Sequence, residues 1–239
     1  MDCHISLQGA DTLTLQGAIL VYKGARDVFA SWHEATAGKG TTPQLGPALP
    51  LSTMFLKSLA EGLGSNLRTE LLPPNVLVRT PDTLVWWTPA KTRRMFFSQF
   101  DKDLGPYSGR SFPHPALVFR VSGRQLRIRA ISQSKRPDAA TPLLVAPYYN
   151  TQESGLVCQG SMRSPDGPFV ESMKAWEEAF FASEFTHLWG GGRMCRHKQG
   201  VAGLWKSVEG TKALPVRLLS NARQTLQEFV GRDSDWGVT

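Results

Sequence analysis

Cysteine is scarce in this sequence, which has only Cys3, Cys158 and Cys195 in 239 residues. Three scattered cysteines cannot build a disulfide framework, and an odd number fits free thiols in a reducing compartment. Long apolar runs are also missing, and the residues after Met1 provide neither the basic start nor the apolar segment of a signal peptide. We therefore expect a cytoplasmic protein that does not span a membrane.

A convincing metal motif is missing too. His187, Cys195 and His197 fall in one region, but Cys195 and His197 are only two residues apart, and no Cys-x-x-Cys pair accompanies them. A structural zinc site normally closes with four ligands. The sequence therefore predicts neither a metal nor a cofactor.

Acidic residues are outnumbered, and the formal net charge is +7, which favours an acidic partner or nucleic acid. None of the usual motifs that bind DNA or RNA is present. Arg127 and Arg129 alternate with apolar residues, which favours a solvated sheet face over a nucleic-acid surface. The basic residues form two loose groups: Lys91, Arg93 and Arg94, then Arg120, Arg124, Arg127, Arg129, Lys135 and Arg136.

Hydrophobic patterns predict an antiparallel arrangement with a few helices. We expect strands at residues 13–22, 28–32, 76–78, 83–87, 91–100, 117–121 and 125–132. Helices are expected after an N-cap at Ser52, ending near Gly64, along an apolar stripe over residues 169–181, and over residues 220–230 with a cap at Ser220 or Asn221.

Domain organisation follows from these elements. Because 41% of the residues are apolar, the chain can bury a substantial core. We divide it into an N-terminal extension with a strand pair (residues 1–50), a core (51–190) and a C-terminal helical extension (191–239). Together they would form one compact α+β unit.

The most informative stretch runs from Pro147 to Gly160. An apolar run ends at Pro147, and two tyrosines, Asn150, a polar turn with Gly155 and a short apolar return lead to Cys158. A cysteine presented on such a loop can act as a nucleophile through its thiolate. The alternative for Cys158 is a buried structural thiol, since free cysteine is among the most buried residue types.

The neighbours of Cys158 also allow two interpretations each. The amide of Asn150 could stabilise an oxyanion, or Asn150 could hold its own loop as a turn residue. Tyr148 and Tyr149 could pack beneath the loop or line a channel for an extended peptide tail. His187 could form a structural hydrogen bond near the end of the helix, which is the interpretation we favour, or a nucleophilic dyad with Cys158, because such partners meet only in space.

The offsets of Asn150, Gly155 and Cys158 resemble those of ubiquitin-conjugating enzymes. In that family an asparagine after His-Pro precedes the active cysteine by eight residues, and a glycine precedes it by three. A narrower resemblance is to protein B of the ParB-related, ThiF-related cassette (PRTRC) of plasmids. It rests on Ala146 to Asn150 and on the segments 141–143, 180–181 and 185–187. This sequence departs from the pattern at Tyr148-Tyr149, where the family has His-Pro, and at Gln159-Gly160.

The resemblance implies a ubiquitin-conjugating-like antiparallel meander packed against helices, with additions at both ends. It implies that Cys158 carries a ubiquitin-like modifier as a thioester, received from a ThiF-like activating enzyme and passed to an amine. Asn150 would assist the chemistry, while Tyr148, Tyr149 and Gly155 would form the tail groove or support the loop. A ParB-like protein is a further candidate partner. The alternative is a non-catalytic adaptor in plasmid maintenance that binds DNA or an acidic partner.

Overall fold

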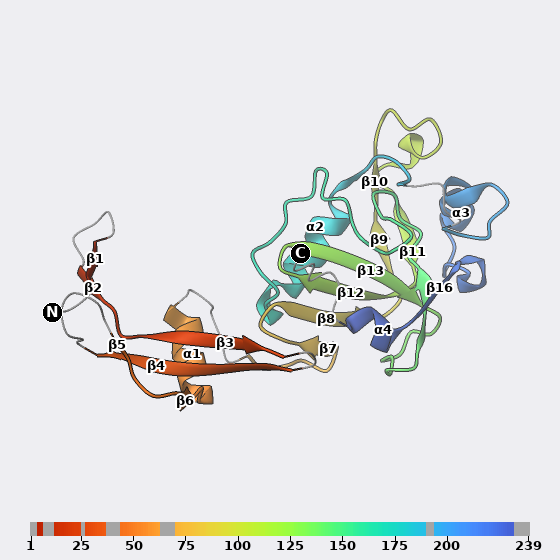
Figure 1. Cartoon of the computed structure of the whole chain (residues 1–239). Helices are drawn as coiled ribbons and strands as arrows, with labels where there is room; N and C mark the ends of the chain where they lie inside the picture. The colour runs from red at the N-terminus through yellow and green to blue at the C-terminus, as the bar shows by residue number, and fades with distance from the viewer. Residues whose placement is uncertain are drawn as a thin grey trace. The chain divides into compact units, whose positions relative to one another are not determined.

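The computed structural model describes residues 4–6, 12–24, 27–36, 44–62, 70–189 and 194–231 (Figure 1). Contacts divide the chain into two compact units, Met1–Arg68 and Thr69–Thr239, whereas the division from sequence has boundaries after residues 50 and 190. In the described part of the chain, no helix is both long enough and apolar enough to cross a membrane.

The first unit contains the expected strand pair. β3 (Gly17–Lys23) and β4 (Val28–Thr36) pair antiparallel. α1 (Thr53–Gly62) begins where predicted, because the Ser52 hydroxyl accepts a hydrogen bond from the Phe55 amide at 3.1 Å. The predicted stop at Gly64 lies outside the described residues. The other strands are β1 (His4–Ser6), paired with β2 (Thr12–Thr14), and β5 (Gln44–Leu45) and β6 (Leu49–Pro50), both paired with β4.

The second unit is built on a six-stranded antiparallel sheet with the order β16-β14-β13-β12-β8-β7. Its middle is the predicted hairpin, in which β12 pairs with β13 through a turn at Gly123. The α+β fold class with an antiparallel meander is therefore confirmed. The strands are β7 (Val76–Arg79), β8 (Thr83–Thr88), β12 (Ala116–Ser122), β13 (Gln125–Ile131), β14 (Pro142–Val145) and β16 (Asn221–Thr225).

Two short strand pairs form separate two-stranded sheets in this unit. β9 (Lys91–Arg94) pairs antiparallel with β11 (Ser111–His114), and β10 (Phe96–Phe97) pairs in parallel with β15 (Glu184–Phe185). The single strand expected over residues 91–100 is thus two strands separated by Met95. The helices of this unit are α2 (Met173–Phe181), α3 (Gly200–Val208) and α4 (Leu226–Val230), with 3₁₀ turns at η1 (Gly105–Tyr107), η2 (Val170–Ser172) and η3 (Val216–Leu218).

Both faces of the sheet are covered, and the alternation of side chains along each strand assigns residues to a face. On β12, Leu117 and Phe119 face the larger core, which includes Trp176 of α2 and Trp205 of α3. Val118 faces a smaller core that includes Phe229 of α4. The apolar stripe predicted for residues 169–181 is core packing, as expected, since Met173, Trp176, Phe180 and Phe181 are all buried.

The solvated sheet face predicted from Arg127 and Arg129 is wrong at Arg129, and Arg120 of the same basic group is not solvated either. Arg120 and Arg129 are buried, with 6% and 4% of their surfaces exposed. α4 covers this face: an Arg120 guanidinium nitrogen donates to the Phe229 carbonyl at 2.9 Å, and the Arg129 guanidinium lies 6.0 Å from the Phe229 ring centre. Neither arginine can therefore belong to an exposed basic surface.

The helix predicted over residues 220–230 is wrong in its first half. Residues Asn221–Thr225 form β16, which pairs with β14 at the edge of the sheet. α4 begins only after Thr225, where the Thr225 side chain and Glu228 form a reciprocal capping box. The C-terminal segment therefore contributes both an edge strand and a covering helix.

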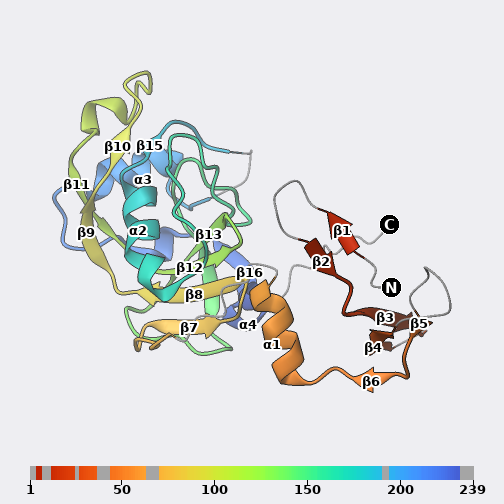
Figure 2. The same ribbon diagram turned by 90° about the vertical axis from the view of Figure 1, so that its left-hand side faces the viewer.

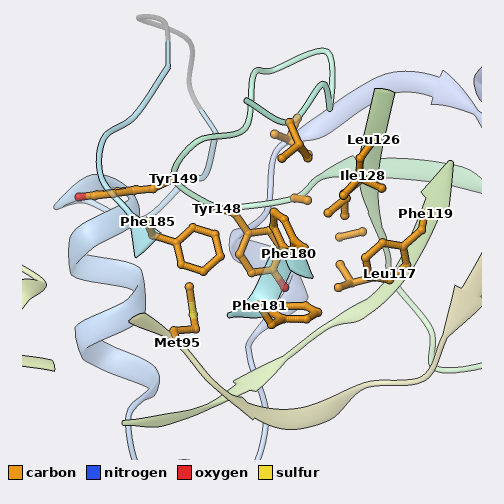
Figure 3. Close-up of a cluster of buried hydrophobic side chains, with 14 of the residues drawn as sticks. Met95, Leu117, Phe119, Leu126, Ile128, Tyr148, Tyr149, Phe180, Phe181 and Phe185 are labelled. Atoms are coloured by element: carbon orange, nitrogen blue, oxygen red, sulfur yellow. The ribbon is translucent and has the colours of Figure 1, made fainter. Parts of the chain in front are cut away.

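His114 and Tyr148 form a polar pair inside the larger core. The Tyr148 hydroxyl lies 2.8 Å from Nδ1 of His114, and both residues are almost fully buried. Figure 3 shows Tyr148 among Phe180, Phe181 and Phe185. Burial, together with the nearby Arg93 guanidinium, lowers the pKa of His114 to about 3. The folded protein thus holds this imidazole neutral.

This pair predicts a pH-dependent stability. A histidine in the unfolded chain titrates near its ordinary pKa of 6.5, so below that pH the unfolded chain binds a proton that the folded chain does not. Stability should therefore fall as the pH drops from 6.5 toward 3, by about 1.4 kcal/mol per pH unit from this group. Urea unfolding at pH 7, 6 and 5 measures the slope. His114→Gln should have a smaller slope, and an unchanged slope would contradict the assignment.

Candidate functional site

The loop that carries Cys158 folds back on itself after β14. The Cys158 amide donates to the Asn150 carbonyl at 2.7 Å, and the Gln152 amide donates to the Leu156 carbonyl at 2.8 Å. A bond of 2.9 Å from the Gly155 amide to the Gln152 carbonyl closes the turn. The loop is thus a small hairpin that sets Cys158 opposite Asn150.

The returning limb of this hairpin is attached to β13. The Val157 amide donates to the Leu126 carbonyl, and the Ile128 amide donates to the Gly155 carbonyl, each at 2.9 Å. β14 pairs with β13 at Arg129 and Ala130. The returning strand of the hairpin pairs with the preceding part of the same β13 edge, at Leu126 and Ile128. The backbone before Cys158 is therefore held by the sheet.

Gly155 is required at the turn for two separate reasons. Its φ of 86° lies in the left-handed region, which side chains rarely adopt. A Cβ at this position would also lie 2.7 Å from the Ile128 carbonyl oxygen. Another residue would strain the turn and push the limb away from β13.

Cys158 and Cys195 differ in their accessibility. Cys158 is partly exposed, whereas Cys195 is buried at 7% exposure, and burial raises the pKa of the Cys195 thiol. A nucleophilic cysteine must be reachable and must ionise. Of these two thiols, Cys158 is the one that an incoming reactant can approach; Cys3 lies outside the described residues.

Asn150 holds two segments together. It is buried at 5% exposure and has a positive φ of 57°, a conformation that asparagine tolerates better than most residues. Its Nδ2 donates to the Glu184 carbonyl at 2.7 Å, and its Oδ1 accepts from the Thr186 amide at 3.1 Å and the Thr186 hydroxyl at 2.8 Å. The side chain therefore clamps the cysteine loop to residues 184–187.

Both tyrosines of the loop are buried. Tyr148 has no exposed surface, and burial raises its pKa well above the ordinary value. Tyr149 is 6% exposed, its ring packs edge-on against Phe97 at 6.3 Å, and burial with the nearby Asp101 raises its pKa. In Figure 3 the two rings point to different sides of the loop backbone. These positions suit support of the loop.

His187 and Cys158 are both hydrogen-bonded to the backbone of Asn150. The Asn150 amide donates to the His187 carbonyl at 2.8 Å, while the Asn150 carbonyl accepts from Cys158. Nδ1 of the exposed His187 ring lies 2.8 Å from the Thr186 hydroxyl, which leaves Nε2 for another partner. The dyad interpretation therefore stays open.

The segment that contains Cys195 and His197 was weighed as a metal site in the sequence. Within the described ranges, no three His, Cys, Asp or Glu side chains are grouped so that they could hold a metal ion. Cys195 and His197 line a shallow hollow beside the start of α3. No Asp or Glu and no further His or Cys is among the described residues that line this hollow.

Sequence reasoning missed the partners of the loop. Glu184 and Thr186 lie more than 30 residues after Asn150 and bind it through a backbone carbonyl, a backbone amide and a hydroxyl. Arg129 also supports the loop, since its guanidinium donates to the Glu153 carbonyl. The Phe-Thr-His segment in the plasmid-family resemblance was the only available signal, and it gave no role for Thr186.

The double requirement at Gly155 can be tested against Gly123, which has a φ of 56° but open space around its missing Cβ. Gly123→Ala should cost about 1–2 kcal/mol for the left-handed backbone alone. Gly155→Ala should cost about 3 kcal/mol or more, because it adds the clash with Ile128. Urea unfolding measures both. Equal losses would show that the close approach to β13 does not constrain the loop.

Comparison with known proteins supports the resemblance at the family level. Residues 53–221, well over half of the chain, match the family described as prokaryotic E2 family D. No curated protein and no solved structure matches. The ubiquitin-conjugating-like resemblance is thus confirmed for the family, and the narrower resemblance to PRTRC protein B remains a hypothesis. The chain belongs to prokaryotic E2 family D.

Proposed function

We propose that this protein carries a ubiquitin-like modifier as a thioester on Cys158. The observation that carries the proposal is the partly exposed thiol at the end of a sheet-anchored hairpin, hydrogen-bonded through its amide to Asn150. A family with a ubiquitin-conjugating-like role supports this chemistry. A fixed and reachable thiol is what transthiolation needs.

The proposed reaction has two acyl transfers. The Cys158 thiolate attacks the carbonyl of a thioester on the activating enzyme, the new C–S bond forms, and the activating enzyme's sulfur leaves as a thiolate. An amine then attacks the Cys158 thioester, an amide bond forms, and the Cys158 sulfur leaves and regains a proton as the amine loses one. Neither step needs a metal or a nucleotide on this chain.

The proposed partners follow from the resemblance to PRTRC protein B. A ThiF-like enzyme would adenylate the C-terminal glycine of the modifier and present it as a thioester. A ParB-like protein would be a further member of the same plasmid-associated system. These assignments rest on the motifs around Cys158 and on the segment 185–187.

Asn150 is proposed to act mainly by holding the loop. Its Oδ1 already accepts two bonds from Thr186, and its Nδ2 already donates to the Glu184 carbonyl. An oxyanion donor would need an N–H directed at the reacting carbonyl beside Cys158. The existing bonds instead direct the side chain toward residues 184–187.

Asn150→Gly separates the two roles, because glycine keeps the left-handed backbone while the side chain is lost. If Asn150 braces the loop, stability should fall by about 1–3 kcal/mol, since the Glu184 carbonyl and the Thr186 amide, both partly buried, lose their partner. The rate of thioester discharge per folded molecule should then change little. Unfolding and single-turnover discharge measure the two effects. Unchanged stability with a loss of about 100-fold in rate would assign Asn150 to the oxyanion.

A non-catalytic adaptor that binds DNA or an acidic partner is the second candidate. The net charge of +7 favours it. Burial of Arg120 and Arg129 removes two of the six cations in the group on which a nucleic-acid surface was based. Binding through phosphates would weaken steeply with salt, whereas a thioester would not. A thiol hydrolase that uses His187 as its base is a third interpretation of the same loop.

A thioester assay tests the carrier proposal. The protein is incubated with ATP, a candidate ThiF-like enzyme and a candidate ubiquitin-like protein, and the products are separated without reducing agent. We expect a thiol-sensitive adduct with the native chain and with Cys195→Ser. Cys158→Ser should give a thiol-resistant ester or no adduct. An adduct that survives in Cys158→Ser and remains thiol-sensitive, or no adduct with the native chain, would contradict the proposal.

A further inference from the structure

A groove of about 530 Å³ runs between β9 and α2, away from the cysteine loop. One wall contains the four residues of β9, Lys91 to Arg94, followed by Phe96. The other wall is α2, which runs beside β9 in both Figure 1 and Figure 2. The α2 residues on this wall are Lys174, Glu177, Glu178 and Phe181, with Ala182 just after the helix.

The sequence spacing of the lining residues shows which side of α2 and which side of β9 face the groove. Positions 174, 177, 178 and 181 fall on one face of a helix. On β9, by contrast, four consecutive residues line the groove, although side chains alternate along a strand. A strand that lines a groove with consecutive residues presents its backbone edge. β9 therefore borders the groove with its hydrogen-bonding edge.

This edge of β9 is unpaired. Within the part of the chain that the structure describes, β9 pairs only with β11. The Met95 amide donates to the Arg110 carbonyl, so by alternation Arg93 and Lys91 direct their backbone groups toward β11. Thr92 lies opposite Pro113, which has no N–H to donate. The backbone groups of Thr92 and Arg94 therefore point to the open side.

The groove combines positive charge with apolar surface. Its lining contains four cations but only two carboxylates, Glu177 and Glu178. Glu177 is shared between Lys91 at 3.6 Å and Arg93 at 3.3 Å, and Nη1 of Arg93 has no partner in the described chain. Phe96 is 39% exposed beside these charges. An occupant of this site should bring carboxylates and some apolar side chains.

We propose that an extended acidic peptide segment of a partner protein binds here as an additional strand on β9. Its backbone would pair with the amides and carbonyls of Thr92 and Arg94, as in strand addition to an open sheet edge. Its carboxylates would lie near Lys91, Arg94 and Lys174, and its apolar side chains would cover Phe96. This binding does not depend on Cys158, so it can fail or succeed independently of the carrier proposal.

Synthetic peptides provide the test on the full chain. The probe is a fluorescein-labelled heptapeptide in which valine and glutamate alternate; its counterparts carry lysine in place of glutamate, or N-methyl groups on alternate amides. We expect the acidic probe to bind, and both counterparts to bind at least about tenfold more weakly in fluorescence anisotropy. Amide exchange at Thr92 and Arg94 should slow in the complex. No binding, or equal binding of acidic and basic probes, would overturn the proposal.

Matched variants at one backbone position test the strand addition itself. Thr92→Pro removes the outward N–H without removing a bond to β11, and proline is tolerated on sheet edges. It should weaken the acidic probe about tenfold or more, whereas Thr92→Val, which keeps the N–H, should bind within about twofold of the native chain. Arg94→Gln combined with Lys174→Gln should weaken binding and reduce its salt dependence. Unchanged affinity in Thr92→Pro would refute backbone pairing.

Two other occupants are distinguished in the same experiment. Light scattering without peptide shows whether the chain self-associates; a dimer that Thr92→Pro abolishes would assign the edge to a second copy. Asp233 and Asp235 lie outside the described residues, and Asp233→Asn with Asp235→Asn tests the chain's own acidic segment. A rise in probe affinity in that variant would assign the groove to this segment. Either result would overturn the proposal of a partner peptide.

Discussion

The candidate site depends on the hydrogen bonds of one buried residue, Asn150. Its carbonyl holds Cys158, its amide holds His187, and its side chain holds Glu184 and Thr186. The bond to Cys158 closes the loop itself, whereas the bonds to Glu184, Thr186 and His187 reach a segment more than 30 residues later. A buried side chain such as that of Asn150 is costly to leave unpaired. The position of the thiol is therefore set by contacts with the segment after α2 as well as by its own loop.

Helices cover both faces of the six-stranded sheet, and this explains why arginines on its strands are buried. β14 and β16 bring α4 over the side where Val118 and Arg120 lie, while α2 and α3 cover the other side. Arg129 contacts both the cysteine loop and β16. One guanidinium nitrogen donates to the Glu153 carbonyl, and another lies 3.3 Å from the Gln224 amide oxygen. Burial lowers the Arg129 pKa to about 10. A residue that resembles surface charge in the sequence thus connects the cysteine loop to β16.

Local signals in the sequence predicted much of this fold, and tertiary contacts account for the rest. The Ser52 cap, the hairpin around Gly123 and the apolar stripe of α2 each depend on neighbouring residues, so they could be predicted. β16 could not, because Asn221–Thr225 lacks an apolar alternation and becomes a strand only by pairing with β14. In the site, the spacing of Asn150, Gly155 and Cys158 identified the loop. The partners of Asn150 bind largely through backbone atoms, which no side-chain pattern encodes.

The groove and the cysteine loop are structurally connected. Only Met95 separates β9 from β10, and β10 pairs in parallel with β15. β15 contains Glu184, whose carbonyl accepts the bond from Asn150. A peptide paired with β9 would therefore bind an element one strand pairing away from the Asn150 side chain. A displacement of β10 would reach Glu184 through the backbone bonds between β10 and β15. Coupling between the two sites would require no contact between the peptide and Cys158, since the intervening strands already link them.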